Sequence, residues 1–196
     1  MIYTIDIPPA FRQDPTQSLH TRCVMCEKEL IESNSPYLIE KSYVKPLGMA
    51  VYETLFEYAI CMDCAVQMRA QMSRESLQRM DSFMAEGLAH DHRQLPDDFE
   101  EAAMVDQWLQ HCALSGQPIE ALTEYQMIAV CQGDQMMVSP DEAHQRMPIV
   151  IGGPAIAELT ELLSPETREE MDRFRDLLGG VPPEWEALLQ GRPVVV

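Results

Sequence analysis

Two pairs of cysteines, each with two residues between its members, are the part of this sequence best suited to chemistry. They are Cys23-Val24-Met25-Cys26 and Cys61-Met62-Asp63-Cys64. A CxxC turn brings its two sulfurs to one side of the backbone, so that both can bind the same ion. Two such pairs in a short domain are typical of a site that holds a tetrahedral Zn²⁺ with four thiolates. The sequence therefore predicts a metal site formed by Cys23, Cys26, Cys61 and Cys64.

The segments around the second pair predict how it is held in place. Residues 37–44 are rich in aromatic and β-branched side chains, and residues 51–60 alternate between apolar and polar, so the two segments predict a β-hairpin. From Met62 to Ala89 there is no proline, and methionine and leucine recur at helical spacing, which predicts a long helix. Ser73 or Ser76 would cap a second helix if this segment is broken. The second cysteine pair thus opens a helix, whose N-terminus stabilises thiolate charge.

This order of knuckle, hairpin and helix, over residues of about 20–90, resembles the treble-clef zinc finger. The resemblance implies that the first pair, Cys23 and Cys26, supplies the knuckle ligands and that the second pair supplies the helix ligands. Glu27 follows the first pair, where treble-clef knuckles commonly have glycine or another small residue. Because this architecture occurs in proteins with many unrelated functions, the resemblance implies a fold and a metal but no particular activity.

Three other states of these cysteines are compatible with the sequence. The four thiols can be buried without a ligand, or they can hold iron, because a tetrahedral site of four sulfurs also suits that metal. The third state is CxxC redox chemistry, which is typical of a βαβ unit, and no such unit is predicted around either pair. Rubredoxin-like iron knuckles usually carry glycine after the cysteines, and this chain does not, so zinc is the predicted metal and iron the alternative. A zinc ion with four sulfur ligands has no open position for a substrate, which predicts a structural role.

A fainter copy of the first unit follows in the second half of the chain. Residues 112–115 match the first CxxC pair, and residues 128–134 match the segment that ends in the second pair. Aligned in this way, Ser115 and Asp134 take the places of two ligands. The segment is then a duplicated finger that has lost its metal, or one that binds a metal through Cys112, Cys131 and Asp134, with His111 as a further candidate. Because serine is a poor zinc ligand, we expect no metal there. The alternative is a chance match, in which Gly133 and Asp134 form an ordinary hairpin turn.

The charge of the chain is unevenly distributed. The net charge is −18, with 9 basic and 13 acidic residues in 1–93 (−4) but 5 basic and 19 acidic residues in 94–196 (−14). Nucleic-acid binding depends on neutralising phosphates, whereas this chain has three lysines, Lys28, Lys41 and Lys45, and no basic stripe. The sequence therefore predicts no nucleic-acid partner. Its acidity fits either a basic protein partner or a well-solvated, self-repelling surface.

These patterns predict an α+β protein in two parts. Residues 1–93 form the zinc-binding unit with its four cysteine ligands, and residues 94–196 form an acidic, α-rich region that includes the fainter copy. The clearest elements of the second part are a strand at 125–131 and helices at 155–163 and 165–178. A single cooperative domain is the alternative to this division.

Targeting and catalytic motifs are not evident in the sequence. No run of about 20 apolar residues predicts a membrane span, and the N-terminus has neither the basic nor the apolar region typical of a signal peptide. We therefore expect a cytoplasmic protein, because paired cysteines in that reducing compartment more often bind metal than form disulfides. No phosphate-binding glycine loop, nucleophile elbow or HExxH motif is present, so no catalytic residue is predicted. The predicted function is a zinc-stabilised module for protein–protein interaction or regulation. The alternative is an enzyme or a rubredoxin-like electron carrier whose site assembles only in three dimensions.

Overall fold

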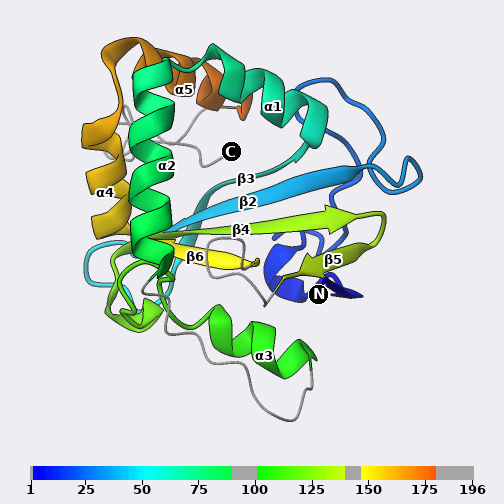
Figure 1. Ribbon diagram of the computed structural model, residues 1–196. Helices are drawn as coiled ribbons and strands as arrows, with labels where there is room; N and C mark the ends of the chain where they lie inside the picture. Colours follow the sequence, from blue (N-terminus) through cyan, green and yellow to red (C-terminus); the bar gives the residue numbers. More distant parts are fainter. Residues whose placement is uncertain (1, 90–100, 140–146, 180–196) are drawn as a thin grey trace.

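The fold is an antiparallel β-sheet with helices packed against it (Figure 1). The computed structural model describes residues 2–89, 101–139 and 147–179. Within these ranges the sheet has six strands. The predicted combination of helices with an antiparallel sheet is confirmed. The predicted boundary at residue 93 lies outside the described residues.

Strand β2 (Pro36–Val44) lies inside the sheet, with a partner on each side. Strand β3 (Glu53–Cys61) returns antiparallel to it, with Tyr37 opposite Cys61, so the predicted hairpin is present. Strand β4 (Glu124–Gln132) pairs with the other side of β2 along its full length. Because β4 belongs to the second half of the sequence, the two halves of the chain share one sheet.

Strands β5 (Gln135–Val138) and β6 (Ile149–Gly152) both pair with the side of β4 that β2 leaves open. β5 follows β4 through a tight turn in which Gly133 has a φ of 59°, as such hairpin turns require. β1 (Tyr3–Asp6) pairs with β5, so that the strand order is β1-β5-β4-β2-β3 with β6 beside β4. The sequence did not predict the four-residue strand β6.

The predicted helix from Met62 to Ala89 is divided in two. Helix α1 (Met62–Gln71) follows β3 directly, and helix α2 (Arg74–Ala89) begins after Ser73. The Ser73 hydroxyl accepts the Ser76 N–H at 3.1 Å and so satisfies one of the unpaired donors at the start of α2. The prediction of one long helix is therefore wrong, and its alternative, a broken segment with Ser73 as the cap of a second helix, is confirmed. A serine side chain competes for the backbone N–H groups that a continuous helix would use.

The other helical elements of the described residues come mainly from the second half of the chain. They are α3 (Glu101–Trp108), α4 (Gly153–Leu162), α5 (Pro165–Leu177) and the short 3-10 turns η1 (Pro9–Phe11) and η2 (Ile119–Ala121). α4 and α5 confirm two predicted helices. Ser164 caps α5, because its hydroxyl accepts the Thr167 N–H at 3.3 Å. No helix in the described ranges is long and apolar enough to cross a membrane.

The central strands are covered on both faces. On one face, the ring of Tyr58 in β3 packs edge-on against Phe174 of α5, with 5.1 Å between the ring centroids. Figure 1 shows α1, α2, α4 and α5 gathered on one side of the sheet. On the opposite face, the N-terminal segment covers Lys41 of β2, whose ammonium donates to the Arg12 carbonyl at 2.7 Å. Lys41 is fully buried as a result.

Candidate metal centre

The first cysteine pair lies in a tight turn that its own backbone holds together. The Cys23 N–H donates to the Lys28 carbonyl, and the Glu27 N–H donates to the Cys23 carbonyl, both at 2.9 Å. Glu27 has a φ of 58°, in the left-handed region that glycine adopts most easily. The turn therefore keeps a glycine-like backbone without glycine, at a cost of about 1 kcal/mol.

The turn is attached to the end of β3, where the second cysteine pair begins. The Val24 N–H donates to the Ala59 carbonyl at 2.9 Å. Cys61 is the last residue of β3 and the N-cap of α1, and Cys64 lies in the first turn of that helix. A loop, a strand end and a helix N-terminus thus carry the four cysteines to one place.

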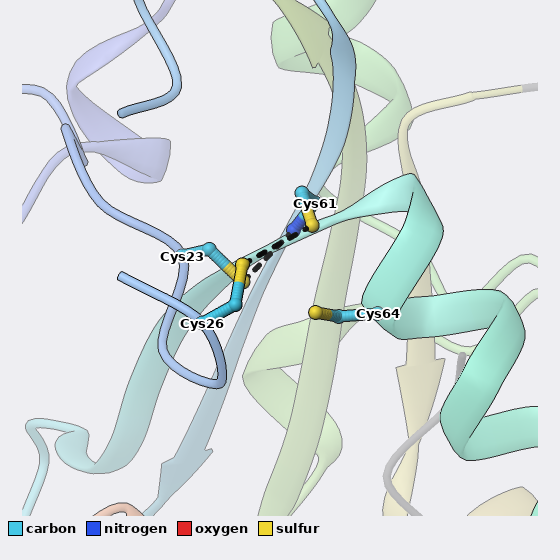
Figure 2. A group of neighbouring side chains, drawn as sticks. All are labelled: Cys23, Cys26, Cys61 and Cys64. Atoms are coloured by element: carbon cyan, nitrogen blue, oxygen red, sulfur yellow. Dashed lines mark hydrogen bonds between the residues drawn. The ribbon is translucent and has the colours of Figure 1, made fainter. Parts of the chain in front are cut away.

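The four sulfurs converge on one another, as Figure 2 shows. The sulfur atoms of Cys23, Cys26, Cys61 and Cys64 all lie within 4.8 Å of one another, and those of Cys26 and Cys61 are 3.8 Å apart. In a tetrahedral site with Zn–S bonds of about 2.3 Å, neighbouring sulfurs are about 3.8 Å apart. Cys26 is exposed and the other three cysteines are buried. The predicted ligands are therefore brought together at a spacing that suits a single ion.

The surroundings of the sulfurs favour a thiolate at one position. Burial raises the pKa of the Cys23 thiol, but the backbone N–H groups of Cys61, Cys26 and Met25 around its sulfur lower it to about 7. Of these, the Cys61 N–H donates to the Cys23 sulfur at 3.4 Å. Burial and the neighbouring sulfurs raise the pKa of the Cys64 thiol well above its ordinary value. Since four thiolates this close repel one another, the cluster suits a bound divalent cation.

The alternative ligand set of the second half does not assemble among the described residues. Cys131 lies in β4 opposite Tyr37, where burial raises the pKa of its thiol to about 12, and Asp134 lies in the turn that follows. The Cys112 sulfur instead accepts the Gly152 N–H at 3.2 Å, at the end of β6. Within the described ranges, no group of three or more potential ligands includes these residues. Cys131 lies in the central strand β4, whereas Cys61 ends β3, which leads into α1. The alignment of Cys131 and Asp134 with the second CxxC pair is therefore wrong.

Comparisons of the chain with protein-family models, with curated proteins and with solved structures find no match. The functional conclusion therefore rests on the geometry of the four sulfurs and on the elements that hold them.

Proposed function

We propose that the chain is a zinc-stabilised module for protein–protein interaction or regulation, and that residues of about 20–90 form a treble-clef-like zinc unit. The observation that carries the proposal is the convergence of four cysteine sulfurs within 4.8 Å. Sulfur donors in a tetrahedral arrangement select Zn²⁺ over metals that prefer oxygen ligands. The order of a knuckle, the β2–β3 hairpin and α1 supports the treble-clef assignment.

The ion in this proposal is structural. Four protein sulfurs fill a tetrahedral shell and leave no position for a substrate or a reactive water. Three of the sulfurs belong to buried cysteines, so the ion would lie at the edge of the core rather than in an open cleft. Metal binding contributes directly to folding, by roughly 10–16 kcal/mol in small zinc peptides. We expect a smaller contribution here, because the hairpin and α1 also pack against the rest of the core.

A role in protein contacts is supported by the loop between β2 and β3. Leu47, Met49 and Val51 all expose apolar side chains there. The pairing of Tyr37 with Cys61 places the cysteines at the other end of the same hairpin. The metal would thus hold one end of the hairpin rigidly while the other presents apolar surface. The net charge of −18 makes a protein, rather than a nucleic acid, the proposed partner.

The metal content and the colour of the purified protein test the first part of this proposal. We expect about one zinc ion per chain and a colourless protein. A coloured protein that contains iron would favour the electron-carrier alternative. A folded protein with neither metal would contradict the proposal.

Affinity capture from the native host tests the second part. Wild-type protein, Cys64→Ser and Cys131→Ser would be immobilised and compared. Both variants lose a buried thiol, but Cys131 lies outside the sulfur cluster and serves as the matched control. We expect wild type and Cys131→Ser to retain the same partner and Cys64→Ser to lose it. A partner retained equally by all three proteins would show that the interaction does not depend on the metal unit.

A further inference from the structure

The chain forms the same turn twice, once at Cys23 and again at Cys112. In each turn the cysteine N–H donates to the carbonyl five residues later, at 2.9 Å in the first and 2.8 Å in the second. The N–H four residues later donates back to the cysteine carbonyl, at the same two distances. The residue that donates this bond has a positive φ in both turns, 58° for Glu27 and 69° for Gly116. An isolated β-bridge closes each turn.

Both turns are attached to a strand in the same way. The residue after each cysteine donates its N–H to a strand carbonyl, Val24 to Ala59 in β3 at 2.9 Å and Ala113 to Val150 in β6 at 2.8 Å. β3 leads directly into α1 and β6 leads directly into α4, and both helices have ten residues. The short strand β6 therefore corresponds to the end of β3.

The cysteine sulfurs accept equivalent bonds. The Cys61 N–H donates to the Cys23 sulfur at 3.4 Å, and the Gly152 N–H donates to the Cys112 sulfur at 3.2 Å. Gly152 thus stands in the place of Cys61. Ala155, three residues further along, stands in the place of the last cysteine ligand.

The strand register agrees with this correspondence. Tyr37 of β2 lies opposite Cys61, and Tyr125 of β4 lies opposite Gly152. β2 and β4 both have nine residues and pair antiparallel from end to end. Exchanging the two strands therefore maps the ladder between them onto itself, as a two-fold axis requires.

The same axis passes between the helices that follow. The Ser73 N–H donates to the Thr167 hydroxyl at 3.0 Å, and the Ser164 N–H donates to the Ser76 hydroxyl at 2.8 Å. Each helix cap thus donates to the residue three positions into the other helix. Such reciprocal contacts are the mark of a two-fold interface between identical units.

We propose that residues 22–89 form one copy of a metal-binding unit and that residues 111–139 and 147–177 belong to a second, the two being fused about an internal two-fold axis, and that the second copy is a former metal site. This inference rests on the metal role proposed above for the first copy. The β2–β4 ladder and the serine contacts then correspond to the interface of an ancestral homodimer.

In the second copy, apolar packing replaces the metal. Cys112 is the one cysteine kept, while Ser115, Gly152 and Ala155 stand in the other three places. A Cβ placed on Gly152 would lie 2.9 Å and 3.1 Å from the two terminal methyls of Leu122 and 3.6 Å from the Cys112 Cβ. Leu122 is buried beside Cys112 and therefore fills space next to the missing ligand. This copy is folded by burial of apolar surface instead of by coordination.

Restoring the ligands tests the proposal. We would combine Ser115→Cys, Gly152→Cys and Ala155→Cys with Leu122→Ala, which makes room at the site, and measure Co²⁺ by titration and by its thiolate charge-transfer absorbance. We expect binding to rise from about one to about two Co²⁺ per chain, with absorbance rising about twofold. The matched control combines Ser115→Cys with Asp134→Cys. With Cys112 and Cys131, these two substitutions complete the four-cysteine set that the sequence alignment suggested. The control should gain no ion.

The outcomes separate the two proposals. A wild-type chain that binds no Co²⁺ would contradict the proposed function, whereas a folded variant that binds no more than wild type would overturn this inference. If the four substitutions prevent folding, Gly152→Cys decides, made together with Leu122→Ala, which leaves room for the new Cβ. This Cβ would lie 3.6 Å from that of Cys112, within the range of about 3.5–4.5 Å for a disulfide. Mild oxidation should link residues 112 and 152, as shown by peptide mass mapping. A folded Gly152→Cys protein that does not form this link would contradict the correspondence with Cys61.

Discussion

The hydroxyl oxygens of Ser73 and Ser164 lie 3.1 Å apart, so that the N-caps of α2 and α5 contact each other. Each serine also accepts a backbone N–H from its own helix, from Ser76 at 3.1 Å and from Thr167 at 3.3 Å. One small group of hydroxyls therefore begins two helices and joins the two halves of the chain. Because the group is partly buried, its hydrogen bonds are less exposed to competition from water.

Removing either cap should destabilise the protein, and the two losses should be coupled. Ser73→Ala and Ser164→Ala should each lower the free energy of unfolding by about 1 kcal/mol, the usual loss for a serine cap. Since the two hydroxyls contact each other, the double variant should differ from the sum by about 0.5 kcal/mol or more. Urea unfolding of the four proteins measures this cycle, with the exposed Ser82→Ala as the control. Additive losses would show that the caps act independently.

Cys26 allows the contribution of the metal to be separated from that of burial. Because this cysteine is exposed, Cys26→Ser changes little besides the ligand set. Loss of a side chain that only supports a metal ligand typically weakens metal binding by roughly 10–100-fold. Because Cys26 is itself a proposed ligand, we expect its loss to weaken zinc binding by more than that. Competition with a chromophoric chelator measures the affinity. Cys131→Ser buries a hydroxyl in β4 and should lose stability while keeping zinc. Unchanged zinc affinity in Cys26→Ser would remove this residue from the proposed site.

The cluster of Cys23, Cys26, Cys61 and Cys64 was predictable because its information is local. The spacing of each CxxC pair and the pattern of residues 51–60 are visible without knowing the fold. The second copy was not predictable in its correct register. Gly152 has no side chain to signal its place, and its relation to Cys112 is a hydrogen bond between residues 40 positions apart in the sequence. The segment that ends at Cys131 resembles the segment that ends at Cys61 more closely in sequence, but it belongs to the central strand β4.

Chelation of the metal should loosen both halves of the chain together. The division at residue 93 predicts that the second half survives metal removal. However, β2 pairs with β3 on one side and with β4 on the other, so that disorder in the hairpin removes a partner from the second half. We therefore expect thermal unfolding of the Co²⁺-loaded protein to follow one curve by Co²⁺ absorbance and by far-UV circular dichroism. A second dichroism transition after the absorbance is lost would support two separate domains.

His20 should make the protein sensitive to mild acid. Its side chain is 6% exposed, and its Nε2 atom has no hydrogen-bond partner among the described residues. Burial lowers the pKa of His20 from its ordinary value of 6.5, although Glu57 and Asp14 nearby raise it, and Lys41 lowers it further. Because the folded pKa lies below the unfolded one, the unfolded chain takes up this proton first. Stability from neutral His20 is therefore present above pH 6.5 and is lost as the pH falls below it.

A comparison of wild type with His20→Gln isolates this effect. We expect the urea midpoint of wild type to fall more than that of His20→Gln between pH 7.5 and pH 5.5. Loss of metal at the lower pH is common to both proteins and cancels in the comparison. Protonation of Asp14 does not disturb the comparison either. Burial raises the pKa of Asp14, but the hydrogen bonds from Lys41 and Thr54 lower it by more, so that Asp14 is protonated at more acidic pH. The exposed His111→Gln serves as the control and should follow wild type. Parallel pH profiles for wild type and His20→Gln would show that His20 does not contribute.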